Sequence, residues 1–310
     1  MTGNEILDDK AAAWPPLPLA AWEDSRATLH MWTQIAGKIR LALAPHVNHW
    51  WQVPLYVSSR GLTTTAMPYG YGSLTLEFDF LDHVLHIITS RGTQPAVQLA
   101  PRSVADFYGE LMARLDEAGT PVRILARPVE VVEAIPFAED HAHDAYDAAA
   151  VERFWRVLIQ VDRIFNAFRG DFTGKASPVQ FFWGSFDLAA SRFSGRTAPP
   201  HPGGMPNVAD WVMREAYSHE VSSAGFWPGG MGEEAAFYGY AYPAPPGYTQ
   251  VAVKPEAAYY HETLGEFILP YEAVRQAADP EATLRQFLDS TYEAAAELGN
   301  WERAALERQR

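Results

Sequence analysis

Residues 73–80 have the sequence SLTLEFDF. Apolar and polar side chains alternate along this segment, and a period of two places one set on each face of a β-strand. The turn Leu81-Asp82-His83 then leads into residues 84–90, VLHIITS, a second apolar run of strand length. Together they predict an antiparallel hairpin with one face buried and the other facing water.

Helical patterns lie on both sides of this hairpin. Apolar residues at helical spacing, with cap residues or Pro and Gly stop signals, predict four helices, at residues 26–44, 104–118, 148–168 and 280–298. Further strand patterns occur at residues 52–59, 61–67, 121–125, 128–137, 178–193, 234–243 and 265–270. Helices grouped with antiparallel strands in this way predict an α+β fold.

Two parts of the chain, residues 1–140 and 148–310, repeat one order of elements. Each begins with a helix that contains a tryptophan, Trp32 or Trp155, and each ends on an extended run into a proline before a closing helix. We therefore predict two related helix/antiparallel-sheet/helix halves within one integrated unit. A divergent duplication and a chance likeness both remain open.

A Gly/Pro-rich segment, residues 194–232, distinguishes the second half. Long irregular segments in compact domains are often binding loops, and the aromatic residues of this one favour an ordered structure. We predict an insertion that forms the wall of a small-molecule pocket, with a helix over residues 208–223. On that helix Glu215 and His219 would be neighbours four residues apart, which suits a catalytic histidine oriented by a carboxylate. A purely structural ion pair is the alternative.

Further candidates for substrate binding lie near this segment. Arg192 and Arg196 flank a glycine-containing turn, where two guanidinium groups could hold a carboxylate or phosphate. Their alternative role is to pair with Asp187 or Glu266. The other predicted substrate-binding residues are Trp183, Tyr217 and His201.

Composition limits the classes of partner. The net charge is −14, from 38 acidic and 24 basic residues, which disfavours nucleic acid and anionic membranes as partners. No cysteine is present, so disulfides and thiolate sites are excluded. The sequence shows no signal peptide and no apolar run of membrane-spanning length, so we expect a cytoplasmic protein. His46 and His49 follow the helix breaker Pro45, and no metal site is predicted there.

Several long segments resemble a bacterial family known only as a domain of unknown function. They are FFWGSFDLAASRFSGR, APPHPGG, REAYSHEVSSAGFWPG, FYGYAYP and LGEFILPYEAVR. The resemblance extends from WPPLPLAAW onward and implies one full-length unit, with no established activity or cofactor.

The residues themselves favour an enzyme that acts on a small anionic molecule by histidine acid/base chemistry. A non-catalytic binding protein and a mononuclear His/carboxylate metalloenzyme are the alternatives, and the cofactor is unknown.

Overall fold

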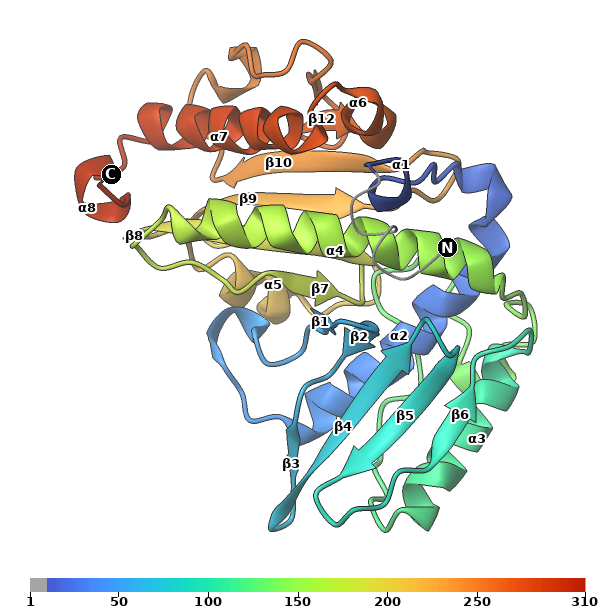
Figure 1. Cartoon of the computed structure of the whole chain (residues 1–310). Coiled ribbons are helices and arrows are strands. Elements are labelled where there is room, and N and C mark those ends of the chain that lie inside the picture. The colour runs from blue at the N-terminus through green and yellow to red at the C-terminus, as the bar shows by residue number, and fades with distance from the viewer. Residues whose placement is uncertain (1–9, 310) are drawn as a thin grey trace.

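The computed structural model describes residues 10–309, and its fold is α+β with two six-stranded antiparallel sheets (Figure 1). The first sheet has the order β1-β2-β4-β5-β6, with β3 also paired to β4. Its strands are β1 (Tyr56–Val57), β2 (Gly61–Thr63), β3 (Met67–Tyr69), β4 (Gly72–Asp79), β5 (Val84–Thr89) and β6 (Ala96–Gln98).

The predicted hairpin is confirmed as β4 and β5. Its register places Leu76 opposite Ile87 and Glu77 opposite His86. Leu76 and Ile87 are fully buried, whereas Glu77 and His86 are partly exposed. The alternation of SLTLEFDF therefore sets which face of the first sheet meets the core.

The second sheet has the order β11-β12-β10-β9-β8-β7. Its strands are β7 (Gln180–Phe182), β8 (Asp187–Thr197), β9 (His219–Trp227), β10 (Ala236–Tyr242), β11 (Tyr259–His261) and β12 (Glu266–Pro270). Every strand pair in both sheets is antiparallel.

The four predicted long helices are confirmed, with ends within a few residues of those expected. They are α2 (Glu23–Leu43), α3 (Val104–Glu117), α4 (Ala148–Gly170) and α7 (Pro280–Leu298). Ser103, Asp147 and Asp279 cap the last three of these helices through side-chain hydrogen bonds. Short helices complete the fold: α1 (Lys10–Ala13), α5 (Asp210–Ala216), α6 (Tyr271–Gln276), α8 (Arg303–Leu306), η1 (Leu19–Ala21), η2 (Asn48–Trp50), η3 (Phe137–Glu139) and η4 (Tyr248–Gln250).

The two sheets meet at the edges formed by β1 and β7. The amide of Leu55 donates to the carbonyl of Phe181 at 2.9 Å, and the amide of Phe181 donates back at 2.8 Å. One continuous hydrophobic core includes residues of both halves. Both halves show the order helix, antiparallel strands, helix, while a common origin of the halves remains a prediction.

Two predictions about local structure are wrong. Residues 121–125 and 128–137 form no strand, because Pro121, Pro128 and Pro136 interrupt any ladder of hydrogen bonds. The helix predicted over residues 208–223 ends at Ala216, and His219 begins β9, a central strand. Most of β9 is buried on both faces, so its sequence lacks the alternation that identifies a half-buried strand.

Candidate functional site

The candidate site lies on the face of the second sheet that is turned away from α4 and α7. These helices cross the opposite face, in front of the strands in Figure 1, and Gly239 of β10 faces Thr291 of α7. Since side chains alternate along a strand, Tyr238 and Tyr240 point to the other face. The strand register places a row of polar side chains on that face: Asp187, Ser191, Ser223, Tyr238, Tyr240 and Glu266.

A cavity of about 390 Å³ opens on this face, within the size range of small-molecule sites. One wall comes from the segment that follows β8, and the other from β10 and the start of β12. The lining residues are His201, Gly203, Gly204, Met205, Met213, Tyr217, Tyr240, Ala241, Tyr242, Leu264, Gly265 and Glu266. We call this cavity the tyrosine pocket.

Hydroxyl groups are linked along the floor of the tyrosine pocket and beside it. The hydroxyls of Tyr217 and Tyr240 are 2.8 Å apart, and those of Ser191 and Ser223 are 2.9 Å apart. Burial is the main cause that raises the pKa of Tyr217, to about 12. These hydroxyls therefore remain protonated at neutral pH and can donate or accept hydrogen bonds.

Three carboxyl groups gather at this face without a cationic partner among residues 10–309. Burial, and then the charge of Asp187, raise the pKa of Glu266 to about 7, and the same two causes raise the pKa of Glu130 to about 7. Burial also raises the pKa of Asp187, although Ser185 and Tyr238 donate hydrogen bonds to it. Carboxyl groups with raised pKa values, at a cavity, are typical of functional sites.

A loop from the first half brings Glu130 to the second sheet. The amide of Glu130 donates to the carbonyl of Pro206 at 2.9 Å, and Asn207 donates to the carbonyl of Val131 at 2.6 Å. Glu130 and Asn207 both have positive φ, of 59° and 55°, a conformation that non-glycine residues rarely adopt. A Cβ at Gly184 would collide with the Glu130 carboxylate, so the glycine leaves room for this close approach.

Two predicted site residues line the tyrosine pocket. The rings of His201 and Tyr217 are stacked, with centroids 4.7 Å apart. The Nδ1 atom of His201 accepts a hydrogen bond from the amide of Gly203 at 3.1 Å, and burial lowers the pKa of His201. The imidazole is therefore neutral at physiological pH. A role of His201 and Tyr217 in binding remains a prediction.

The predicted pairing of Glu215 with His219 is wrong, because the two residues belong to different elements. Glu215, on α5, forms an ion pair with His46 at 2.8 Å. His219, on β9, lies beside His49, with ring centroids 5.6 Å apart. Neither Glu215 nor His219 lines the tyrosine pocket.

Arg192 and Arg196, predicted to hold a carboxylate or phosphate, lie in different surroundings, and neither lines the tyrosine pocket. Arg192 is 4% exposed and lies on the helix-covered face, stacked on Phe168 and Tyr292. Arg196 forms an ion pair with Glu220 at 2.7 Å and donates to the carbonyls of Gly299 and Asn300, directly after the last residue of α7. The first arginine is part of the core, and the second caps a helix end.

Trp183, the remaining predicted residue, lies between the two halves and is 6% exposed. Its indole N–H donates to the carbonyl of Val53 at 2.8 Å, and the ring lies against Gly37 of α2. This position joins the halves and is away from the tyrosine pocket.

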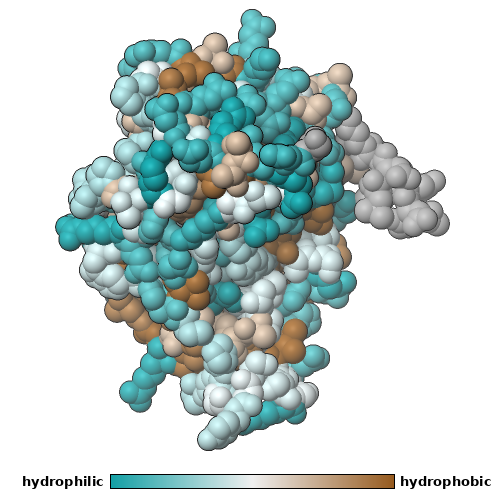
Figure 2. All heavy atoms as spheres, turned by 90° about the vertical axis from the view of Figure 1, so that its left-hand side faces the viewer, coloured by the Kyte–Doolittle hydropathy of each residue, from teal (hydrophilic) through white to brown (hydrophobic). Residues whose placement is uncertain are grey.

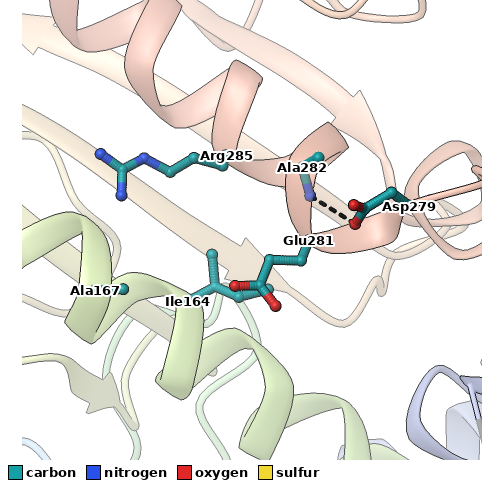
Figure 3. Close-up of a pocket in the computed structure, with 6 residues that line it drawn as sticks. All are labelled: Ile164, Ala167, Asp279, Glu281, Ala282 and Arg285. Carbon is teal, nitrogen blue, oxygen red and sulfur yellow. Dashed lines mark hydrogen bonds between the residues drawn. The ribbon is translucent and has the colours of Figure 1, made fainter.

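A second cavity, of about 300 Å³, lies between α4 and α7 (Figure 3). Asp279 caps α7, Glu281 pairs with Arg163 at 2.6 Å, and Arg285 pairs with Asp171 and Asp289. Because its polar groups already have partners, this cavity offers few free groups to a ligand.

Residues 10–309 contain no group of three or more His, Asp or Glu side chains arranged to hold a metal ion. These residues therefore provide no set of metal ligands for the metalloenzyme alternative. In the same residues, no helix has the length and apolar character needed to cross a bilayer. The face drawn in Figure 2 is mainly hydrophilic, with apolar residues in small separate groups.

Sequence reasoning missed Glu130 and the shared environment of Glu266 and Asp187. A usable signal was present, since each of the last two lies beside an apolar strand segment, FILP or LAA, with no basic residue next to it. Glu130 gave no comparable signal, because a long loop positions it.

Comparison with known proteins identifies the family and goes no further. No curated protein and no solved structure matches the chain. The model of one protein family matches residues 14–308, which is nearly the whole sequence. The chain therefore belongs to the family of unknown function DUF5996, in agreement with the resemblance found in its sequence.

Proposed function

We propose that the protein binds a small, neutral or positively charged organic molecule in the tyrosine pocket and that Glu266 exchanges a proton with it. One observation carries this proposal. Glu266 lies in the pocket wall with its pKa raised to about 7, and no cation within residues 10–309 neutralises it. A carboxyl group of this kind is half protonated at neutral pH, so it can both donate and accept a proton.

The pocket walls support this class of ligand. Tyr217, Tyr240 and Tyr242 offer ring faces and hydroxyl groups, which suit a ligand with an apolar part and hydrogen-bonding groups. Glu266 interacts with Asp187, and Asp187 interacts with Glu130, so the local potential becomes negative as these groups ionise. Positive charge on a ligand would be stabilised by the carboxylates and by the electron-rich ring faces.

Two features of the sequence-based hypothesis receive less support. An anionic substrate would meet carboxylates in this pocket, and both candidate arginines have other partners. Proton transfer by His219 would need a second site, because this residue does not line the cavity. Both ideas remain untested predictions.

A series of ligands that differ mainly in charge tests the proposal. Benzylamine, benzyl alcohol and benzoate are titrated into the full-length protein at pH 8 by calorimetry. We expect benzylamine to bind at least about tenfold more tightly than benzoate, a difference of about 1.4 kcal/mol. Tighter binding of benzoate would contradict the proposed charge preference.

The variant Glu266→Gln tests which group sets that preference. It keeps the shape of the side chain and should remove the advantage of benzylamine. The control Glu262→Gln changes an exposed residue of the same sign and should keep it. For any ligand found to be turned over, the rate should change with pH near 7 in the wild type and lose this dependence in Glu266→Gln. Binding without turnover would favour the non-catalytic alternative.

A further inference from the structure

A second group of reactive side chains lies beyond the tyrosine pocket, around Lys175. The Lys175 ammonium donates a hydrogen bond from Nζ to Nε2 of His49 at 2.7 Å. The Nδ1–H of His49 donates to the backbone carbonyl of Ala216 at 2.9 Å. Because a carbonyl only accepts and an ammonium only donates, this chain of contacts fixes the tautomer, with the lone pair of His49 on Nε2.

Partial burial makes the charged form of Lys175 less stable than that of a solvated lysine. No carboxylate pairs with Lys175 within residues 10–309, and its Nζ atom lies 5.3 Å from the ring centroids of both Trp51 and Phe193. Burial lowers the pKa of Lys175. A partly buried lysine that lacks a carboxylate partner has a larger share of neutral, nucleophilic amine than a solvated lysine, although the two ring faces favour its charged form.

The histidine in contact with Lys175 is kept neutral. His49 is 4% exposed, and burial is the largest cause that lowers its pKa, with the charges of Lys175 and His219 acting in the same direction and the backbone contacts opposing them. Beside it, His46 and Glu215 form their own ion pair at 2.8 Å. A neutral imidazole, with its lone pair directed at Lys175, can accept a proton from that nitrogen.

The backbone around His49 gives an independent sign of a functional position. His49 and Trp50 both have positive φ, of 58° and 62°, in succession. Neither is glycine, and consecutive residues in this region cost conformational free energy unless their surroundings hold them there. Such strain is concentrated at active sites and ligand clamps in known proteins.

We propose that Lys175 is a nucleophile that forms an imine with a small aldehyde or ketone, with His49 as its proton acceptor. The contacts reproduce a general arrangement of covalent catalysis: a nucleophile within hydrogen-bonding reach of a base, and the base oriented by a third group, here the Ala216 carbonyl. This site is separate from the tyrosine pocket and does not depend on the function proposed for it.

The reaction balances without a further reagent. The neutral Lys175 amine attacks the carbonyl carbon, so that the C–N bond forms and the π electrons of the carbonyl move to its oxygen. His49 Nε2 takes a proton from the positively charged nitrogen and returns it to this oxygen, which gives a neutral carbinolamine. The nitrogen lone pair then expels the hydroxyl, which leaves as water with a proton from the solvent. The iminium that remains gives its N–H proton to His49, which releases it to the solvent, and a C=N bond is left. Hydrolysis by the reverse path restores the amine, so the lysine is not consumed.

Reductive trapping tests this proposal on the full-length protein. Propanal and sodium cyanoborohydride are added at pH 7, and modified lysines are located and followed over time by peptide mass spectrometry. The chain has only four lysines, Lys10, Lys38, Lys175 and Lys254, so each site is resolved. We expect Lys175 to be alkylated at least about tenfold faster than the exposed Lys254. Equal rates at these two residues would overturn the proposal.

Two further measurements separate proton transfer from mere exposure. His49→Gln should slow alkylation of Lys175 about tenfold or more and leave Lys254 unchanged, whereas the control His86→Gln on the first sheet should change neither. If His49→Gln does not fold, the wild type still decides the question. The ratio of the rates at pH 7 and pH 10 should be higher for Lys175 than for Lys254, and an equal ratio would contradict an activated amine.

Discussion

Two buried aspartates, one in each sheet, have different hydrogen-bond partners and opposite shifts in pKa. Asp79 in β4 is 1% exposed, and it pairs with Arg60 and accepts from the amides of Leu81 and Asp82, both at 2.9 Å. Burial opposes the charge of Asp79, but these hydrogen bonds outweigh it and its pKa is lowered. Asp187 in β8 is 6% exposed, receives hydroxyl donors instead of a cation, and has a raised pKa.

The difference separates a stabilising carboxylate from one suited to chemistry. In the first sheet the negative charge is matched where it is buried, so ionisation favours the folded state. In the second sheet, burial disfavours the ionised forms of Asp187, Glu130 and Glu266, the charge of Asp187 adds to this for both glutamates, and the folded state favours the protonated forms. Buried carboxyl groups without a cationic partner reduce stability, and proteins accept such a loss mainly at functional sites.

The largest effect should come from removing the cation of the first sheet. Arg60→Ala leaves the buried Asp79 carboxylate with the amides of Leu81 and Asp82 and with His86 at 3.7 Å, and we expect a larger loss in the free energy of unfolding at pH 7 than in either comparison below. Because the pKa of Asp79 is lowered, its contribution is present above pH 3.8 and is lost as the pH falls below that value. Urea unfolding at pH 7 and pH 3 measures the loss of stability and its dependence on pH. The exposed Arg123→Ala is the control, and an equal loss there would remove the distinction.

A smaller effect, of opposite sign, is expected in the second sheet. The pKa of Glu130 is raised from 4.5 to about 7, so the wild type loses stability as the pH rises between these values and the loss is complete above 7. Glu130→Gln removes this loss and should stabilise the protein by about 2 kcal/mol at pH 8, with no gain at pH 4.5. Urea unfolding at the two pH values is the measurement. A destabilised variant at pH 8 would show that the Glu130 carboxylate has an ionic partner.

The smallest changes in stability are expected when single hydroxyl groups are removed from the uncovered faces of the two sheets. Ser223, 4% exposed, bonds to Ser191 at 2.9 Å, so Ser223→Ala should cost about 1 kcal/mol. Thr75→Val removes a hydroxyl from the partly exposed face of β4 and should change stability by less than about 0.5 kcal/mol. Thermal unfolding of both variants at one pH makes the comparison. An equal loss of stability in the two variants would mean that both faces are hydrated to the same extent.

The elements with a clear period could be predicted from the sequence. The alternation of SLTLEFDF predicts β4, and helical spacing predicts the four long helices, three of them with their side-chain caps. β9 was mistaken for a helix because six of its nine residues are buried in succession and several are small, so neither period is visible. That error also produced the Glu215–His219 pair.

The candidate site was predicted only in part, for a physical reason. His201 and Tyr217 could be predicted because the composition of their loop indicates the wall of a cavity, and both line the tyrosine pocket. The carboxyl groups depend on contacts between distant segments: Glu130 meets Gly184, and Glu266 senses Asp187. The Lys175–His49 contact spans 126 residues, which no local pattern can reveal.

The paired hydrogen bonds between Leu55 and Phe181 also bear on how this protein avoids aggregation. β1 and β7 are the last strands at one side of their sheets, and an unpaired strand edge is a template for strands of other molecules. Each half protects part of that edge in the other. Separation of the two halves would therefore expose two strand edges at once, each able to pair with strands of other molecules.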